Sequence, residues 1–205
     1  RGVKKRTMAA IAALLAAGGF FGLAPGIADR SMNKIDGQPL IPVSAEAKAL
    51  HKTLTIVDLH SDTLLWNRDL LAPADHGHED LPRLEKGNVA LQVFSSVTKT
   101  PRGLNYDSNS SDSDSLTALV IAQLQPVRSW FSLAERSLWH GEKLRRAVAS
   151  SGGRLVQVRD PAGMDALLNV RASGKAPVGA LFSAEGLHSL EGQRATLDRF
   201  YAAGM

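Results

Sequence analysis

Three polar side chains at the end of one short apolar segment are of the types that bind metal ions. Asp58, His60 and Asp62 alternate with Val57 and Leu59. If this segment is a strand, the alternation aims all three polar side chains toward one side. An imidazole nitrogen and a carboxylate oxygen are ligands of Zn²⁺, so His60 and Asp62 could bind one ion together. The motif is short, and spacing alone favours a His and an Asp that only hydrogen-bond each other.

Glu185 is the second carboxylate that could carry chemistry. It follows the apolar segment 177–182 and precedes Gly186, so it lies where a strand would end. Ligand sites of parallel α/β folds gather at the carboxyl ends of strands, and the two oxygens of a carboxylate can each bind one cation. A Glu at this point could instead interact with the dipole of a following helix. The residues alone leave both explanations open.

The remaining residue types narrow the chemistry further. The chain has no Cys, which excludes thiolate metal sites, a Cys nucleophile and disulfides. No Gly-x-Ser-x-Gly elbow supports a serine nucleophile. His76 and His78 could form a separate metal cluster, but they lie in a loop after Pro73 with no strand to hold them. A solvated or substrate-lining loop is therefore favoured there.

Short apolar segments alternate with helical patterns through the body of the chain. Strands are expected at residues 54–59, 88–94, 154–158 and 177–182. This alternation indicates βα units, a parallel sheet and helices on its faces. Four units fit the first half of a (β/α)₈ TIM-like barrel, and on pattern alone they fit an open doubly wound sheet equally well. No glycine-rich phosphate loop follows any expected strand, which argues against nucleotide binding.

Three of the expected helices have clear signals. One should follow Pro126, because apolar side chains recur there at helical spacing and should form one buried face. These side chains are Val127, Trp130, Phe131, Ala134 and Leu138. Another helix should begin at Asp160-Pro161, a capping residue followed by a proline at the first helical position. A last helix should cover residues 193–203 and end at Gly204.

Residues 1–28 have the three parts of an export signal. Four cations within residues 1–6 precede an apolar run at residues 8–23, and small residues follow up to Ala28. Cleavage before Asp29 would make the segment a signal peptide. Counted on to Ala28, the run has 21 residues, enough for an uncleaved membrane anchor with its basic end inside. We expect a periplasmic or extracellular protein, or one held to the membrane only by residues 1–28.

The net charge of +4 does not indicate nucleic-acid binding. Residues 1–28 hold four of the 24 Lys and Arg and no Asp or Glu, so the rest of the chain has 20 basic and 20 acidic residues. A neutral body has no basic surface that could follow a phosphate backbone. Nucleic acid is therefore not an expected partner.

Several blocks of the body, in the right order, resemble the membrane dipeptidase (renal dipeptidase-like) family of zinc peptidases. Residues 57–64 (VDLHSDTL) resemble the family's first-strand motif, Asp-x-His-x-Asp. Residues 80–84 (DLPRL) and 87–95 (GNVALQVFS) are similar to its next block. Residues 184–186 (AEG) resemble its Glu-Gly motif, and residues 197–204 resemble the segment before its following strand.

The resemblance implies a distorted (β/α)₈ barrel with two zinc ions per complete chain. His60 and Asp62 would bind one zinc, Glu185 would bridge both, and Asp58 would orient a ligand. The family's two other His ligands, its substrate-contacting His and its acid/base Asp would follow residue 205. The chain is therefore expected to be an amino-terminal fragment that is inactive by itself. Its expected domains are the signal or anchor at 1–28, a spacer and lead-in helix at 29–53, and the barrel part at 54–205.

The implied reaction is zinc-dependent hydrolysis of a dipeptide by a hydroxide that bridges the two metal ions. Two alternatives remain open. The protein could be another metal-dependent amidohydrolase, acting on a lactone, cyclic amide or phosphoester, or a non-catalytic exported binding protein on the same barrel. The sequence also leaves open which dipeptides are cleaved, whether D-residues are accepted, and whether the chain forms a homodimer.

Overall fold

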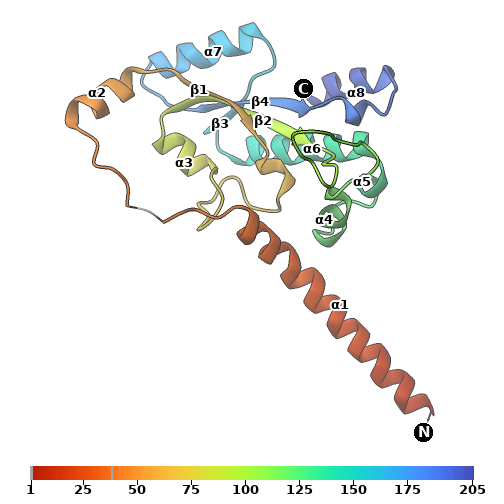
Figure 1. Cartoon of the computed structure of the whole chain (residues 1–205). Helices are drawn as coiled ribbons and strands as arrows, with labels where there is room; N and C mark the ends of the chain where they lie inside the picture. Colours follow the sequence, from red (N-terminus) through yellow and green to blue (C-terminus); the bar gives the residue numbers. More distant parts are fainter. Residues whose placement is uncertain (1, 38) are drawn as a thin grey trace.

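The computed structural model describes residues 2–37 and 39–205. Figure 1 shows a body of strands and helices from which the first helix stands out. In chain order, the elements are α1 (Gly2–Met32), α2 (Ala45–Thr53), β1 (Ile56–Ser61), the 3-10 helix η1 (Thr63–Leu65), α3 (Leu81–Lys86), β2 (Val89–Val97), α4 (Leu116–Ala122), α5 (Arg128–Phe131), α6 (Leu133–Ser150), β3 (Leu155–Gln157), α7 (Pro161–Ala172), β4 (Val178–Glu185), the 3-10 helix η2 (His188–Leu190) and α8 (Ala195–Ala203).

The strands of the described residues form a parallel sheet in the order β1-β2-β4-β3. The predicted α/β class is confirmed, and each expected strand is present with bounds shifted by one to three residues. The strand order differs from the chain order that four consecutive barrel units would have. β3 has 3 residues and pairs only with the first half of β4, Leu155 opposite Val178. It therefore extends the sheet beside the amino-terminal half of β4 alone.

Helices cover both faces of the sheet (Figure 1). On one face, α3 and α6 pack against a buried cluster that includes Phe94 of β2 and Phe182 of β4. Gly141 lets α6 approach closely, because a Cβ at this position would lie 3.0 Å from the ring of Phe182. On the other face, Leu167 of α7 packs against Leu91 of β2. This two-sided cover agrees with the apolar strands predicted from the sequence.

The helix expected after Pro126 is divided in two, and this part of the prediction is wrong. α5 ends at Phe131, and Ser132 takes an extended conformation with φ −113° and ψ 121°. The Ser132 hydroxyl accepts a hydrogen bond from the backbone amide of Glu135 at 3.2 Å and so begins α6. Because the helix axis is interrupted, Val127 and Phe131 do not join the buried face, and they are 70% and 81% exposed.

The other two helix signals are confirmed. The Asp160 carboxylate caps α7 by accepting a hydrogen bond from the backbone amide of Gly163 at 2.7 Å. α8 ends at Gly204, whose φ of +104° is a conformation that favours glycine. Local capping chemistry therefore sets the ends of these helices.

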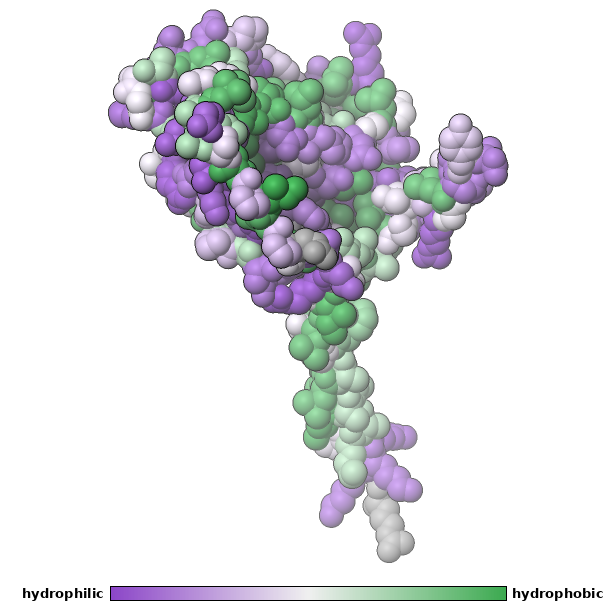
Figure 2. All heavy atoms as spheres, turned by 60° about the vertical axis from the view of Figure 1, so that its left-hand side comes forward, coloured by the Kyte–Doolittle hydropathy of each residue, from purple (hydrophilic) through white to green (hydrophobic). Residues whose placement is uncertain are grey.

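Helix α1 continues past the predicted end of the export signal. It runs unbroken through Pro25 and ends at Met32 rather than at Ala28. The segment Lys4–Met32 is long and apolar enough to cross a membrane, judged by its length and composition. Figure 2 shows this helix standing clear of the body, with apolar residues along its length and hydrophilic residues toward its free end. α2 lies within residues 29–53, where a spacer and a lead-in helix are expected.

Candidate metal centre

His60 lies near the carboxyl end of β1, where the strand pairing is irregular. Asp58 pairs with Gln92 and Ser61 pairs with Phe94, and the register shifts between these two pairs. The side chains of Gln92 and Phe94 lie on one face of β2, so those of their partners Asp58 and Ser61 lie on the same face of the sheet. His60 directly precedes Ser61, and its side chain therefore lies on the opposite face. The predicted alternation of Asp58 and His60 toward one side is therefore wrong, because β1 has one extra residue between the two pairs.

Asp58 contacts the backbone of this irregular segment. Its carboxylate accepts a hydrogen bond from the backbone amide of His60 at 3.1 Å. The contact steadies the segment that carries the His60 side chain. It is compatible with the orienting role expected for Asp58, whose carboxylate is not in the ligand group described next.

Three ligand side chains meet beyond the carboxyl ends of β1 and β4. His60 Nε2 lies 3.3 Å from Asp62 Oδ1 and 3.3 Å from Glu185 Oε2. The three residues each offer one ligand atom, and these atoms all lie within 4.8 Å of one another. Among the residues that the structure describes, they are the group of His, Asp and Glu that could hold a metal ion.

The strand between the two ligand strands leaves room for this approach. β2 lies between β1 and β4, with Ser95 opposite Ser183 and Val97 opposite Glu185. These β2 residues share the face of Glu185, and the small side chain of Ser95 leaves space above the strand. The long side chains of His60 and Glu185 can therefore meet across β2.

The chemistry of the three ligands fits a cation. Asp62 Oδ1 is buried and makes no hydrogen bond within the described residues. Burial raises the pKa of Asp62 and the Glu185 carboxylate raises it further, whereas His60 lowers it. A cation would bind this oxygen of Asp62 and would offset the repulsion between the carboxylates of Asp62 and Glu185. One imidazole nitrogen and two carboxylates form a donor set that suits Zn²⁺.

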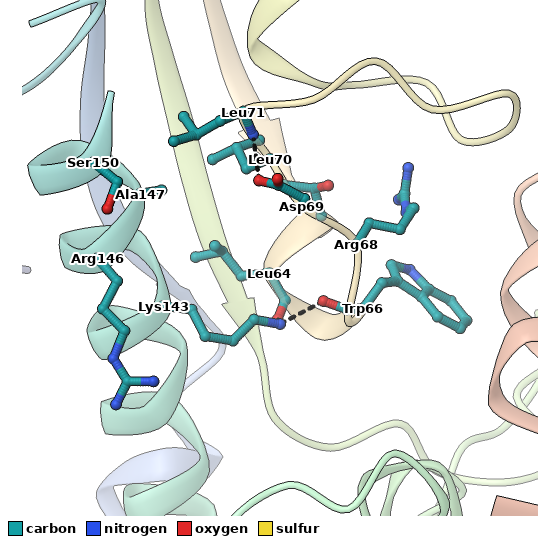
Figure 3. Close-up of a pocket in the computed structure, with 11 residues that line it drawn as sticks. Leu64, Trp66, Arg68, Asp69, Leu70, Leu71, Lys143, Arg146, Ala147 and Ser150 are labelled. Atoms are coloured by element: carbon teal, nitrogen blue, oxygen red, sulfur yellow. Dashed lines mark hydrogen bonds between the residues drawn. The ribbon is translucent and has the colours of Figure 1, made fainter. Parts of the chain in front are cut away.

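The turn that follows Asp62 is held from behind by Lys143 of α6 (Figure 3). The Lys143 ammonium donates hydrogen bonds to the backbone carbonyl of Leu64, at 2.7 Å, and to that of Trp66. Burial lowers the pKa of Lys143 to about 8. Leu64, Leu65 and Trp66 are also buried, so packing and hydrogen bonds together fix η1 directly after the ligand.

The residues drawn in Figure 3 line a pocket between η1 and α6. The volume of this hollow is about 370 Å³. Its cationic side chains already have partners. Lys143 binds two carbonyls, Arg68 is paired with Asp29, and Arg146 lies over the Trp139 ring and near Glu142. The cationic side chains of this hollow are therefore engaged by other described residues, and Lys143 among them supports the turn.

A second cavity, of about 300 Å³, adjoins the candidate metal centre. Besides His60 and Asp62, its lining includes Asn33, His78 and Glu79. Burial raises the pKa of Glu79 to about 7, with the Ser61 hydroxyl lowering it and the Asp58 carboxylate raising it. One carboxylate oxygen of Glu79 is buried and makes no hydrogen bond within the described residues. This cavity is where a substrate could reach the ligands.

His76 and His78 do not form a separate metal cluster within the described residues. His76 Nδ1 lies 2.7 Å from Asp75 Oδ1, and its Nε2 lies 3.1 Å from Asp29 Oδ2. His78 is exposed and lines the cavity beside the ligands. The loop therefore contributes to the wall of the cavity, in agreement with the interpretation favoured from the sequence.

Sequence reasoning missed Glu79, Arg68 and Asn33 as residues of this cavity. None of them lies in a periodic pattern or at a predicted strand end. The one available signal for Glu79 was its place beside His78 and directly before Asp80, the residue that caps α3. Asn33 comes from the end of α1, and only the folded chain brings it near.

Comparisons with known proteins identify the family of this chain. A family model described as membrane dipeptidase (peptidase family M19) matches residues 44–205. The comparison with curated proteins finds no match. Among solved structures, the crystal structure of the dipeptidase AC, a metallopeptidase of family M19, is 22% identical, with a TM-score of 0.49 over 75% of this chain and 41% of that chain. This chain thus spans about two fifths of the length of that protein. Since the family model covers most of the sequence, including all three ligand residues, the chain belongs to the membrane dipeptidase family.

Proposed function

We propose that this protein binds zinc through His60, Asp62 and Glu185 and contributes these ligands to the hydrolysis of dipeptides. The observation that carries the proposal is the convergence of three ligand atoms within 4.8 Å at the carboxyl ends of two strands. Ligand sites of parallel α/β folds lie at this edge of the sheet. Membership of a family of membrane dipeptidases supports the reaction class.

Each ligand has a distinct part in this proposal. His60 would donate a lone pair from Nε2, and Asp62 would offer its Oδ1, which makes no hydrogen bond within the described residues. Glu185 has two carboxylate oxygens, so it can hold two cations, and two zinc ions per complete enzyme are part of the proposal. When bound, zinc would lower the pKa of a water molecule and polarise the scissile carbonyl. Asp58 keeps the backbone amide of His60 in place.

The cavity beside the ligands defines where a substrate would lie. Its wall carries Glu79 and His78, and one side is closed by Trp66 and Leu84. A small molecule with polar ends, such as a dipeptide, matches a cavity of about 300 Å³ in size and polarity. The exposed mouth of the cavity lets water reach Asp62 and His60.

The first experiment measures zinc content by plasma emission and dipeptide hydrolysis for the purified complete gene product and for its Glu185→Ala variant. We expect Glu185→Ala to lose at least about half of the bound zinc and about 100-fold or more of the hydrolysis rate, because a bridging ligand is removed. Glu46→Ala, an exposed Glu on α2, is the matched control and should change neither value. A well-folded complete gene product that binds no metal would contradict the proposal and favour a binding protein. Metal-dependent hydrolysis of a lactone or phosphoester, but of no dipeptide, would favour another amidohydrolase.

Export of the protein is the second part of the proposed function. The basic start and apolar run of residues 1–28, together with the single long helix α1, support export to the periplasm or the cell exterior. A carboxyl-terminal reporter that is active only outside the cytoplasm tests this part. Reporter activity that does not depend on residues 1–28 would contradict it.

A further inference from the structure

The last turns of α1 are packed against the body and are not free in solvent. Their half-buried side chains share one helix face, because they recur at a spacing of three or four residues. They are Phe21, Ala24, Pro25 and Ala28. Ala28 packs against the buried cluster that contains Trp66 and Leu116, and in Figure 3 the ribbon of α1 passes beside the Trp66 ring.

Polar contacts hold the residues that follow this face. Asp29 is only 7% exposed, and its Oδ2 lies 3.3 Å from Arg68 Nε and 3.1 Å from His76 Nε2. The backbone amide of Gly77 donates a hydrogen bond to the Asn33 carbonyl at 2.8 Å. Gly77 has a φ of +76°, and a Cβ at this position would collide with the Arg68 guanidinium. The loop is therefore shaped to let Arg68 reach Asp29.

Upstream of these contacts, α1 exposes large apolar side chains on several sides. Leu14, Leu15 and Leu23 are 73%, 72% and 65% exposed. Residues 8–27 of the helix, which precede the packed Ala28, are about 30 Å long at about 1.5 Å per residue, close to the thickness of the hydrocarbon layer. Lys4, Lys5 and Arg6 lie at the free end, where cations favour the cytoplasmic side of a membrane. A lipid bilayer is the partner that fits this surface.

We propose that α1 stays attached to the exported protein as a membrane anchor, and that residues 28–33 form a joint with the loop 66–80. Ala28 and Asp29, on the two sides of the predicted cleavage point, are both helical and both inside this joint. Asn33 and Arg68 belong to the joint and also line the cavity beside the metal ligands. The joint therefore holds the candidate metal centre at the membrane-facing end of the body. This inference goes beyond the proposed hydrolysis and does not depend on it.

The first test follows the whole chain, with a carboxyl-terminal tag, after expression in a bacterial host. We expect a species whose intact mass includes residues 1–28, found in the membrane fraction and released by detergent but not by alkaline carbonate. A version with residues 1–28 replaced by a cleavable signal peptide is the control and should be released with the periplasm. A wild-type species that begins at Asp29 and is released by osmotic shock would overturn the proposal.

The second test examines the joint itself by trypsin cleavage after Arg30 in detergent-solubilised protein. Asp29→Ala removes the contacts to Arg68 and His76, and we expect cleavage about tenfold faster, since cleavage follows the open population. Asp36→Ala, an exposed Asp outside the joint, is the matched control and should be cleaved at the wild-type rate. Circular dichroism of both variants verifies that the body stays folded. Equal cleavage rates for all three proteins would overturn the joint.

Discussion

At the residue scale, burial sets the properties of the groups around the candidate metal centre. Asp62 and Glu79 are both carboxylates with a buried oxygen that makes no hydrogen bond within the described residues. Asp62 lies among the ligands, where a cation would stabilise its charge. Glu79 lies on the wall of the cavity, where burial raises its pKa to about 7. The same residue type thus has two different environments within one site.

The raised pKa of Glu79 predicts a pH dependence of stability in the metal-free protein. Between pH 4.5 and about 7 the folded state binds more protons than the unfolded state, so stability falls as pH rises through this window. Glu79→Gln cannot ionise and should avoid this loss. We expect its free energy of unfolding to exceed that of the wild type by about 1–3 kcal/mol above pH 7, and by much less near pH 4.5.

Urea denaturation across this pH range, with a chelator present, measures the effect. Glu46→Gln on the exposed helix α2 is the control for the substitution itself. A stability difference between Glu79→Gln and wild type that does not grow between pH 4.5 and 7 would show that Glu79 titrates normally.

At the element scale, the irregular pairing of β1 and the helix α6 position the ligands. The irregular pairing of β1 turns His60 toward the face of Glu185. Behind the turn, α6 supplies Lys143, whose ammonium binds the carbonyls of Leu64 and Trp66 (Figure 3). α6 is itself fixed to the sheet by its buried contacts. The ligand geometry therefore depends on α6 even though α6 provides no ligand.

Lys143 gives the element scale its own prediction. Its folded pKa of about 8 is below the ordinary lysine value of 10.5, so the folded state binds fewer protons between these two pH values. Stability of the wild type should therefore rise between pH 8 and 10.5, by about 3 kcal/mol at most. Lys143→Met should lack this rise. Lys175→Met, on the protein surface, should keep it, and thermal melts at several pH values distinguish the two variants.

At the scale of the whole molecule, the three ligands are fewer than the proposed pair of zinc ions needs. A catalytic zinc ion has three protein ligands and an open position, so two bridged ions need more than three side chains. We propose that the complete enzyme supplies the further ligands that two zinc ions require. The side chains of His60, Asp62 and Glu185 are 42–54% exposed, which is high for the ligands of a complete metal centre.

We therefore expect the 205-residue chain alone to bind zinc weakly. Addition of about 10 µM zinc in mild detergent should raise its melting temperature by no more than about 2 °C, because weak binding stabilises little by mass action. The same chain with Glu185→Ala sets the baseline. A zinc-dependent rise of about 8 °C or more would mean that residues 1–205 already form a tight site.

Features that depend on neighbours along the chain could be predicted from the residues alone. Apolar segments bounded by turn residues predicted all four strands and the α/β class. Capping chemistry predicted the start of α7 at Pro161 and the end of α8 at Gly204, because a cap uses groups within a few residues. The resemblance of residues 57–64 and 184–186 to a known family indicated the ligands and the reaction class.

Features that depend on contacts between distant segments became visible only in the folded chain. The turn of His60 away from Asp58 results from pairing with β2, and no local pattern encodes an extra residue in one strand. The position of β3 at the sheet edge beyond β4 is likewise a matter of pairing. Glu79 has its raised pKa because other segments bury it, and Asp29 is buried because Arg68 and its loop fold over the end of α1. Burial and strand register are properties of the assembled chain, so no window of the sequence contains them.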